Sequence, residues 1–377
     1  MKYFLVAGEA SGDLHAGNLM AAIKRTDPQA RFRFLGGDRM AIHGGEPITH
    51  YRDMAFMGII AVIKHARSLL GILKDCKQAI LDWEPDVLIL VDYASFNLRV
   101  AAYVKRHRPD MPVHFYISPK LWAWKTYRIR AFKRHIDALY VVFPFEPDFF
   151  NKHAFKAQYV GNPSVDSVAA FKATAIDSRH FKTAHGLDER PILALLPGSR
   201  LAEIRSNITL MAAVAARFSA YQVVVAGAPG VDPAVYQKLL PPSTPLVFNA
   251  TYDLLQVAHV AMVTSGTATL ETALFGVPQV VCYAVKGGEL ANWVFDHWMK
   301  VPFFSLVNLI AGKAVVPELM GGRLNVENLT AALMPLLTDS SERAAMLAGY
   351  DEVKTRLGEP GAAERTAKAI CASLGMT

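Results

Sequence analysis

The chain has 377 residues, enough for two or three domains, and its apolar content of 52% supports sizeable hydrophobic cores. The longest uncharged apolar run near the N-terminus, residues 54–63, is too short to span a membrane, and the first residues lack the apolar core of a signal peptide. Cys76, Cys282 and Cys371 have neither metal-binding nor redox spacing. These features predict a protein of the reducing cytoplasm.

The net charge of +7 is concentrated in the first half of the chain. Residues 1–162 carry 23 Lys and Arg against 15 Asp and Glu, whereas residues 163–377 carry 17 against 18. We therefore expect the first half to face an anionic partner, such as nucleic acid, an acidic membrane surface or a phosphorylated substrate.

Two acids in the first half follow predicted strands. A strand at 3–7 leads into a Gly-containing turn with Glu9, and a buried strand at 85–91 leads into Asp92. The carboxyl ends of parallel strands form the edge where such sheets bind ligands, so Asp92 is a candidate general base. Glu9 is either a second acid of that site or a cap of the next helix.

Residues 53–81 predict a helix with one apolar stripe bordered by basic side chains. An ordinary helix facing the core explains this pattern, and the alternative is a face that rests on an anionic membrane. On the second interpretation, the residues that contact the membrane or an acylated substrate are Ile60, Val62, Ile63, Lys64, Arg67, Leu69 and Leu70.

A strand at 113–117 leads into a segment with Trp122 and Trp124, and basic residues follow at 125–135. Interleaved aromatic and basic residues occur in proteins that bind single-stranded nucleic acid. No pattern of an RNA-binding module accompanies them, so we expect no nucleic-acid partner. We assign both tryptophans to the face that contacts the substrate or the membrane.

A second alternation of strands and helices begins after a hinge near residue 162. Two successive βαβ halves predict two doubly wound α/β domains, at 1–162 and 163–350. We expect residues 351–377 to form a helix that packs back on the first domain or crosses to a partner chain, in which case a homodimer forms.

Two turns of the second half are candidate anion sites. Gly198, Ser199 and Arg200 follow the strand at 192–196, and the turn of Ser265, Gly266 and Thr267 follows the apolar run at 260–263. Backbone N–H groups at helix N-termini bind anions, and an arginine can contact a phosphate through two hydrogen bonds. Two such turns suit a diphosphate, although ordinary strand–helix loops would look the same.

Glu271 lies about one turn into the helix after the second turn, with no Lys or Arg three or four positions away. A carboxylate near a phosphate-binding turn can accept hydrogen bonds from ribose hydroxyls. The alternative is a solvated acid on the helix surface.

Five segments together are specific: residues 6–13 (VAGEASGD), 118–124 (SPKLWAW), 196–200 (LPGSR), 265–271 (SGTATLE) and 308–312 (NLIAG). Through them, nearly the whole chain resembles the lipid-A-disaccharide synthases. This resemblance implies two Rossmann-like domains that face each other across a cleft (the GT-B type). It also implies an inverting transfer at the inner face of the inner membrane, where the protein is peripherally bound, without metal or cofactor. The implied substrates are UDP-2,3-diacylglucosamine and 2,3-diacylglucosamine 1-phosphate, which give lipid A disaccharide 1-phosphate and UDP.

The resemblance also implies roles for individual residues. The essential acid of the family corresponds to Asp92, and a further acid of the family corresponds to Glu9. The family's diphosphate-binding arginine corresponds to Arg200. A donor-site asparagine falls on Asn308, and Glu271 falls on the ribose-binding position of related glycosyltransferases. The chain departs from the family where many members have an acid instead of Ser95 and a histidine instead of Asn162.

Two other functions remain open on the sequence. One is a UDP-sugar epimerase of the same two-domain shape, which would not need the basic amphipathic helix. The other is a protein that binds a nucleotide sugar or a membrane surface without catalysis.

Overall fold

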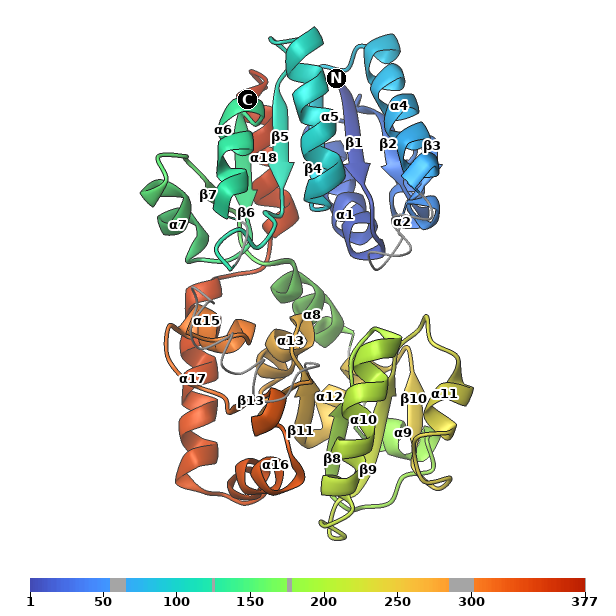
Figure 1. The fold of residues 1–377 in the computed structure, drawn as a ribbon, viewed down its shortest axis with the longest axis vertical. Helices are drawn as coiled ribbons and strands as arrows, with labels where there is room; N and C mark the ends of the chain where they lie inside the picture. Colours follow the sequence, from blue (N-terminus) through green and yellow to red (C-terminus); the bar gives the residue numbers. More distant parts are fainter. Residues whose placement is uncertain (55–65, 124–125, 175–177, 285–301, 377) are drawn as a thin grey trace. The chain divides into compact units, whose positions relative to one another are not determined.

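The computed structural model describes residues 1–54, 66–123, 126–174, 178–284 and 302–376, with the side chains of 66, 67, 178 and 179 outside this description. The chain forms two compact units, and the first combines both ends of the chain (Figure 1). It consists of Met1–Pro163 with Glu359–Thr377, and the second unit is Ser164–Gly358.

The first unit contains a seven-stranded parallel sheet in the order β3-β2-β1-β4-β5-β6-β7. Its central strands are continuous apolar runs, because a parallel sheet is covered by helices on both faces. β1 pairs with both β2 and β4, so the loops after β1 and β4 open side by side at the switch point of the sheet. The strands are β1 (Lys2–Ala7), β2 (Arg31–Gly36), β3 (Glu46–His50), β4 (Val87–Val91), β5 (Val113–Tyr116), β6 (Ala138–Val141) and β7 (Gln158–Tyr159).

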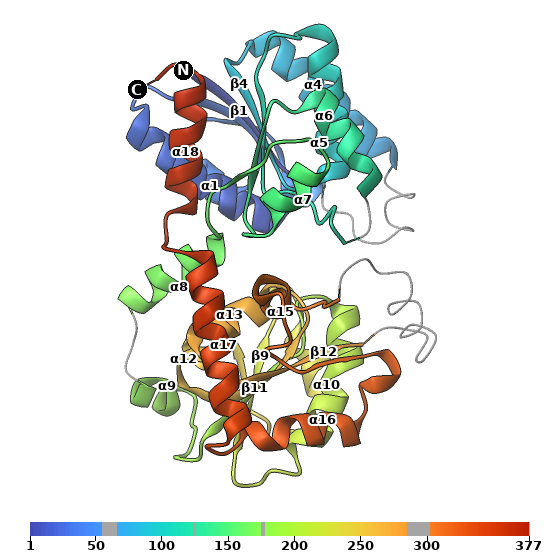
Figure 2. The same ribbon diagram turned by 90° about the vertical axis from the view of Figure 1, so that its left-hand side faces the viewer.

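Helices cover both faces of this sheet. Figure 2 shows α1 and α18 on one face and α4, α5 and α6 on the other. On the second face, Leu73, Cys76 and Ile80 of α4 join the hydrophobic core. The helical segments are α1 (Ala10–Thr26), α2 (Asp38–Ala41), η1 (Tyr51–Asp53), α4 (Ala66–Trp83), α5 (Ala94–His107), η2 (Thr126–Arg128), α6 (Ile129–His135), α7 (Glu146–Lys152) and α18 (Ala362–Ser373).

The second unit contains a six-stranded parallel sheet in the order β10-β9-β8-β11-β12-β13. β8 pairs with both β9 and β11, so this sheet also has a switch point beside its first strand. The strands are β8 (Ile192–Leu196), β9 (Gln222–Gly227), β10 (Leu246–Phe248), β11 (Ala258–Thr264), β12 (Gln279–Tyr283) and β13 (Glu318–Met320).

The helical segments of the second unit are α8 (Pro163–Ala173), α9 (Ser178–Ala184), α10 (Leu201–Ala215), α11 (Pro233–Gln237), α12 (Thr251–Val257), α13 (Thr267–Phe275), α15 (Leu306–Ala311), η3 (Gly321–Arg323), α16 (Val326–Leu333), η4 (Met334–Leu336) and α17 (Ser341–Leu357). Two doubly wound α/β domains are thus present, which confirms the predicted fold class.

The last segment differs in its boundary from the predicted residue 351. That residue lies within α17, which stays in the second unit and ends at Leu357. Gly358 follows with a φ of +72°, a conformation that disfavours other residues, and the chain then joins the first unit. There α18 packs along α1, with Arg25 paired to Glu364. The Arg365 Nε donates a hydrogen bond to the Val160 carbonyl oxygen at 2.7 Å.

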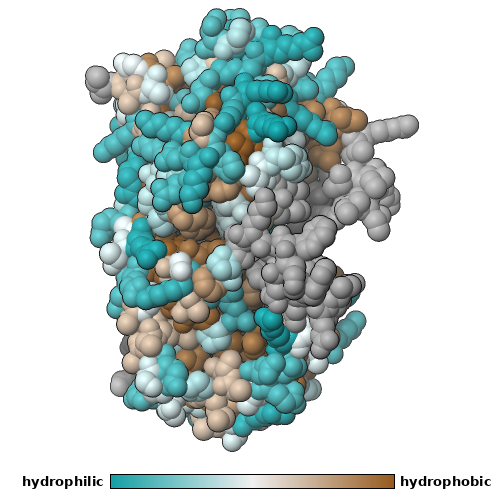
Figure 3. All heavy atoms as spheres, turned by 60° about the vertical axis from the view of Figure 1, so that its left-hand side comes forward, coloured by the Kyte–Doolittle hydropathy of each residue, from teal (hydrophilic) through white to brown (hydrophobic). Residues whose placement is uncertain are grey.

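No helix within the described residues combines the length and the apolar character that a membrane span requires. Figure 3 shows one face of the molecule, on which hydrophilic side chains predominate and hydrophobic residues form separate patches.

Asp13 of α1 connects the first turn of the chain to α2. The residue is 2% exposed, and its carboxylate accepts hydrogen bonds from the backbone N–H groups of Gly37 (2.7 Å), Arg39 (3.1 Å) and Met40 (3.2 Å). We expect Asp13→Ala to lower the free energy of unfolding by about 2–3 kcal/mol, because it leaves buried donors without an acceptor. Asp13→Asn keeps one acceptor oxygen and should cost less. Denaturant unfolding measures both, and an unchanged midpoint for Asp13→Ala would contradict this role.

Candidate functional site

The loops after β1 and β4 line a pocket of about 610 Å³ in the first unit. A Cβ at Gly8 would overlap the ring of Tyr93, so glycine is needed where these two loops meet. The lining residues are Glu9, Leu69, Leu70, Leu73, Asp92, Tyr93, Ala94, Ser95, Phe96, Arg99, Pro119 and Arg128. The structure thus brings the two predicted catalytic acids, Glu9 and Asp92, into one pocket.

Asp92 directly follows β4, where the backbone is held in an unusual conformation. Asp92 and Tyr93 both have a φ of +45°, a left-handed geometry that is costly for non-glycine residues. Asn97 stabilises this turn by donating from Nδ2 to the carbonyl oxygens of Asp92 (2.7 Å) and Val91 (3.2 Å). Such strain is typical of functional sites.

Burial raises the pKa of Asp92 to about 6, and the negative charge of Glu9 contributes in the same direction. The Tyr93 backbone N–H and the Lys120 ammonium group partly oppose this rise in pKa. A carboxylate with a pKa near the working pH is suited to general base catalysis. Glu9 occupies the N-cap position of α1 but makes no capping hydrogen bond, so capping does not explain this acid.

The residues predicted to contact a membrane or an acylated substrate divide into three groups. Leu69 and Leu70 line the pocket of the first unit, and Leu70 is 55% exposed. Trp122 is only 7% exposed and packs edge-on against Phe143 and Phe145, so it belongs to the core and the surface prediction is wrong for it. Outside the described residues lie Ile60, Val62, Ile63, Lys64 and Trp124, together with the side chain of Arg67.

In the second unit, the turns after β8 and β11 line a pocket of about 300 Å³. The two strands are neighbours, so their turns lie beside each other at the switch point. Six of the predicted donor-binding residues meet here: Gly198, Ser199, Ser265, Gly266, Thr267 and Glu271. The predicted pairing of the two turns is therefore present in the structure.

The turn after β8 holds a carboxylate of the chain itself. The Oε2 of Glu203 accepts hydrogen bonds from the backbone N–H groups of Ser199 (3.2 Å) and Arg200 (3.3 Å). Gly198 has a φ of +119°, and a Cβ there would lie 2.7 Å from the Cβ of Glu203. An anionic ligand that used these donors would have to replace Glu203. The acid at the third position after the turn was an available sequence signal for this contact.

Arg200 does not line this pocket. Its side chain is 59% exposed, and its Nη1 lies 3.0 Å from the Oε1 of Glu203. An exposed pair of this kind contributes little to stability, so the guanidinium group is free to exchange partners.

Glu271 of α13 points into the pocket and is held by Tyr252 of α12. The Tyr252 hydroxyl donates a hydrogen bond to the Glu271 Oε1 at 2.8 Å. Burial raises the pKa of Glu271, and the bond from Tyr252 partly opposes this rise. Glu271 is thus not a freely solvated acid, and the sequence carried no signal for its contact with Tyr252.

Asn308 lies in the core and does not line the pocket. It is 1% exposed, and its Nδ2 donates to the Val316 carbonyl oxygen and the Glu318 Oε1, both at 2.9 Å. Its Oδ1 accepts from the backbone N–H groups of Val315 (2.7 Å) and Val316 (2.9 Å). Because these bonds engage both side-chain polar atoms, Asn308 acts here as a structural residue of the segment before β13, contrary to the predicted ligand contact.

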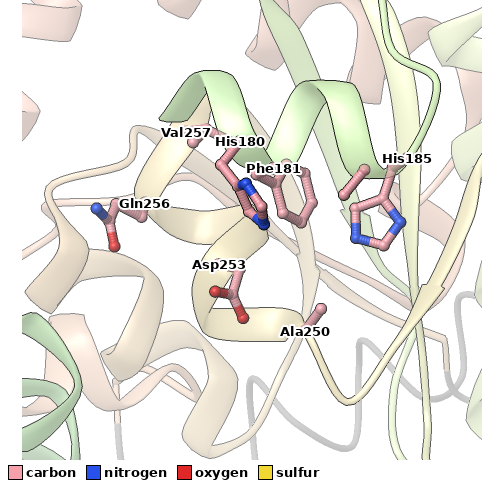
Figure 4. Close-up of a pocket in the computed structure, with 8 residues that line it drawn as sticks. His180, Phe181, His185, Ala250, Asp253, Gln256 and Val257 are labelled. Carbon is pink, nitrogen blue, oxygen red and sulfur yellow. The ribbon is translucent and has the colours of Figure 1, made fainter. Parts of the chain in front are cut away.

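A third cavity, of about 220 Å³, lies between α9 and α12 (Figure 4). Its polar side chains are those of His180, His185, Asp253 and Gln256, and it contains no residue that the sequence singled out. In the part of the chain that the structure describes, no three His, Cys, Asp or Glu side chains gather to hold a metal ion.

Comparisons with known proteins identify relatives that match nearly the whole chain. The family model described as lipid-A-disaccharide synthetase matches residues 3–370. A lipid-A-disaccharide synthase of Myxococcus xanthus is 40% identical, over 98% of this chain and 96% of that protein. A lipid-A-disaccharide synthase of Solibacter usitatus is 35% identical, over 98% and 96%.

Solved structures show the same fold at low sequence identity. A putative UDP-N-acetylglucosamine 2-epimerase from Listeria monocytogenes has a TM-score of 0.66 and 15% identity, over 100% of this chain and 97% of that one. A calicheamicin glycosyltransferase has a TM-score of 0.58 and 16% identity, over 99% and 98%. Because the family model and the relatives span nearly the full length, the chain belongs to the lipid-A-disaccharide synthase family.

Proposed function

We propose that the chain is an inverting glycosyltransferase that joins UDP-2,3-diacylglucosamine to 2,3-diacylglucosamine 1-phosphate, giving lipid A disaccharide 1-phosphate and UDP. The observation that carries this proposal is the Asp92 carboxyl, which lines an apolar-walled pocket with a pKa raised to about 6. The relatives of Myxococcus xanthus and Solibacter usitatus are lipid-A-disaccharide synthases, which supports the identity of the product.

In this proposal the second unit binds the UDP of the donor. The backbone donors of the two turns and the N-terminus of α13 suit its diphosphate, and Arg200 reaches it after leaving Glu203. Glu271, oriented by Tyr252, accepts hydrogen bonds from the ribose hydroxyls. These contacts stabilise the negative charge that develops on the departing diphosphate.

Asp92 is the proposed general base of the first unit. The 6-hydroxyl oxygen of the acceptor attacks the anomeric carbon of the donor sugar, and Asp92 accepts the proton of that hydroxyl. The bond from that carbon to the β-phosphate oxygen breaks, and UDP leaves with the electron pair. A sugar hydroxyl is far less acidic than a carboxylic acid, so proton transfer must be concerted with attack. A single displacement inverts the anomeric carbon.

An epimerase of the same fold is the second candidate. The likeness to the epimerase structures concerns the fold, and their identity to this chain is only 11–15%. The leucines that line the first pocket favour an acylated substrate over a soluble one.

Incubation of the purified protein with UDP-2,3-diacylglucosamine, with and without the acylated acceptor, tests the proposal. We expect UDP release only when both are present, together with a disaccharide product by mass spectrometry. Isomerised donor in the absence of acceptor would instead support an epimerase, and binding without turnover would support a non-catalytic protein.

We further propose that the first unit associates peripherally with an anionic membrane surface, on the cytoplasmic side where the donor is available. Leu70, which is exposed at the lining of the pocket, and the basic composition of residues 1–162 support this. Leu70→Ser should weaken sedimentation with anionic vesicles without changing the melting temperature. Met334→Ser, at a residue of the second unit that is 60% exposed, is the matched control and should sediment as the parent does. If Leu70→Ser and Met334→Ser sediment equally with the vesicles, Leu70 does not contact the membrane.

The pH dependence of transfer tests the role of Asp92. Asp92 acts without its proton, so kcat/KM should fall as the pH drops through about 6. Glu9→Gln removes a charge that raises this pKa, so the acidic limb should move to lower pH. The phosphate of the substrate also titrates near this pH, but the parent and Glu9→Gln are assayed with the same substrate. The difference between their two pH profiles therefore reports on Asp92. An identical acidic limb in both would contradict the assignment.

Asp92→Asn is the companion variant. It should lower kcat/KM by about a hundredfold or more above pH 6, where the parent carboxylate is charged, and the difference should shrink at lower pH, where the parent also loses its base.

A further inference from the structure

Two arginines line the pocket of the first unit, and neither the motifs nor the proposed chemistry uses them. Arg99 lies on α5, one helical turn after Ser95, and Arg128 ends η2. Residues four apart on a helix share a face, and the Nη2 of Arg128 donates a hydrogen bond to the Ser95 Oγ at 3.0 Å. Ser95 thus contacts Arg128 and lies on the same helix face as Arg99.

The two arginines differ from Lys105 of α5 and from Arg108, which follows that helix. Lys105 pairs with Asp137 at 2.6 Å, and Arg108 pairs with Glu84 at 3.2 Å. Among the described residues, neither Arg99 nor Arg128 forms an ion pair with a carboxylate. Ser95 is neutral, so it orients Arg128 without cancelling its charge.

The pocket therefore presents three kinds of contact to a ligand. Glu9 and Asp92 are hydrogen-bond acceptors, and the charges that affect the Asp92 pKa are those of Glu9 and Lys120. Leu69, Leu70 and Leu73 provide an apolar wall. The two guanidinium groups can donate several hydrogen bonds in a fixed geometry that matches phosphate oxygens. A molecule with a hydroxyl, acyl chains and a phosphate satisfies all three.

We propose that Arg99 and Arg128 bind the phosphate group of the acceptor and so select a phosphorylated over an unphosphorylated acylated sugar. This inference rests on the proposed transferase function and adds a recognition site to it. The neighbouring leucines contact the acyl chains, which directs the hydroxyl end of the same molecule toward Asp92.

Arg99→Gln and Arg128→Gln test the proposal, with Arg106→Gln as the matched control. Arg106 is an exposed residue of the same helix that does not line the pocket. For each protein, KM is measured for 2,3-diacylglucosamine 1-phosphate, for the same sugar without the phosphate, and for the donor. Losing a charge-assisted hydrogen bond should raise KM for the phosphorylated acceptor about tenfold or more in each pocket variant. KM for the donor and for the unphosphorylated acceptor should match the parent.

An equal rise in KM for both acceptors would overturn the proposal, because the arginines would then act on something other than the phosphate. Sedimentation with vesicles of phosphatidylglycerol, without acceptor, separates the acceptor from a lipid headgroup. We expect the pocket variants to sediment as the parent does, and a tenfold loss there would assign the arginines to the membrane surface instead.

Measuring the affinity of each protein for the phosphorylated acceptor in mixed detergent micelles tests the phosphate site without requiring sugar transfer. If the parent protein transfers no sugar, the transferase function fails. Even then, a selective loss of phosphorylated acceptor binding in Arg99→Gln and Arg128→Gln would support the phosphate site. Unchanged binding in both variants would overturn it.

Discussion

In each sheet, the strand that comes first in the sequence pairs with a neighbouring strand on both of its sides. This arrangement determines where each unit can bind a ligand. At such a switch point in a parallel sheet, the helices that follow two neighbouring strands pack on opposite faces of the sheet. The loops that connect these strands to their helices therefore diverge, and a crevice opens between them. β1 lies between β2 and β4 in the first unit, and β8 lies between β9 and β11 in the second. Each unit therefore has one pocket at its switch point, and the side chains in the two pockets give them different chemistry.

The pocket of the first unit combines acids with an apolar wall, which makes the charged form of Asp92 costly and raises its pKa toward neutrality. The pocket of the second unit is built from backbone donors and small side chains, and the chain places its own Glu203 carboxylate on part of them. The first pocket is thus suited to removing a proton, and the second is suited to holding the diphosphate of the donor. This division of labour fits a transferase whose base and leaving-group site come from different units.

The inner strands of each sheet, the two turns and the two acids could be predicted from the sequence, because most of these strands are short apolar runs and several are followed by a Gly, Ser or acidic residue. The short edge strands β3, β7 and β13 were not predicted, since none of them is a continuous apolar run. The Glu9 and Asp92 pocket followed from the rule that parallel strands share a carboxyl edge. Contacts between segments far apart in the chain could not be predicted. The bond from Tyr252 to Glu271 and the position of Arg128 beside Ser95 depend on how helices pack.

For Trp122 and Asn308, the sequence predicted a ligand contact where the structure shows a packing role. Both belong to motifs that the family shares, yet the structure buries one among aromatic rings and engages the other with backbone groups. A motif identifies a constrained residue, and the constraint can be packing as well as binding. The boundary at Gly358 was readable from the glycines and proline at 358–361, which end α17 and prevent a continuous helix into α18.

Calorimetric titration of UDP into Asp92→Asn and Glu271→Gln tests the central claim, that the base and the nucleotide site belong to different units. We expect Asp92→Asn to bind UDP as the parent protein does, although it transfers sugar about a hundredfold more slowly. Glu271→Gln should bind UDP about tenfold more weakly, because a neutral amide accepts hydrogen bonds from hydroxyl groups less strongly than a carboxylate. Weakened UDP binding in Asp92→Asn, with unchanged binding in Glu271→Gln, would show that the nucleotide site does not belong to the second unit.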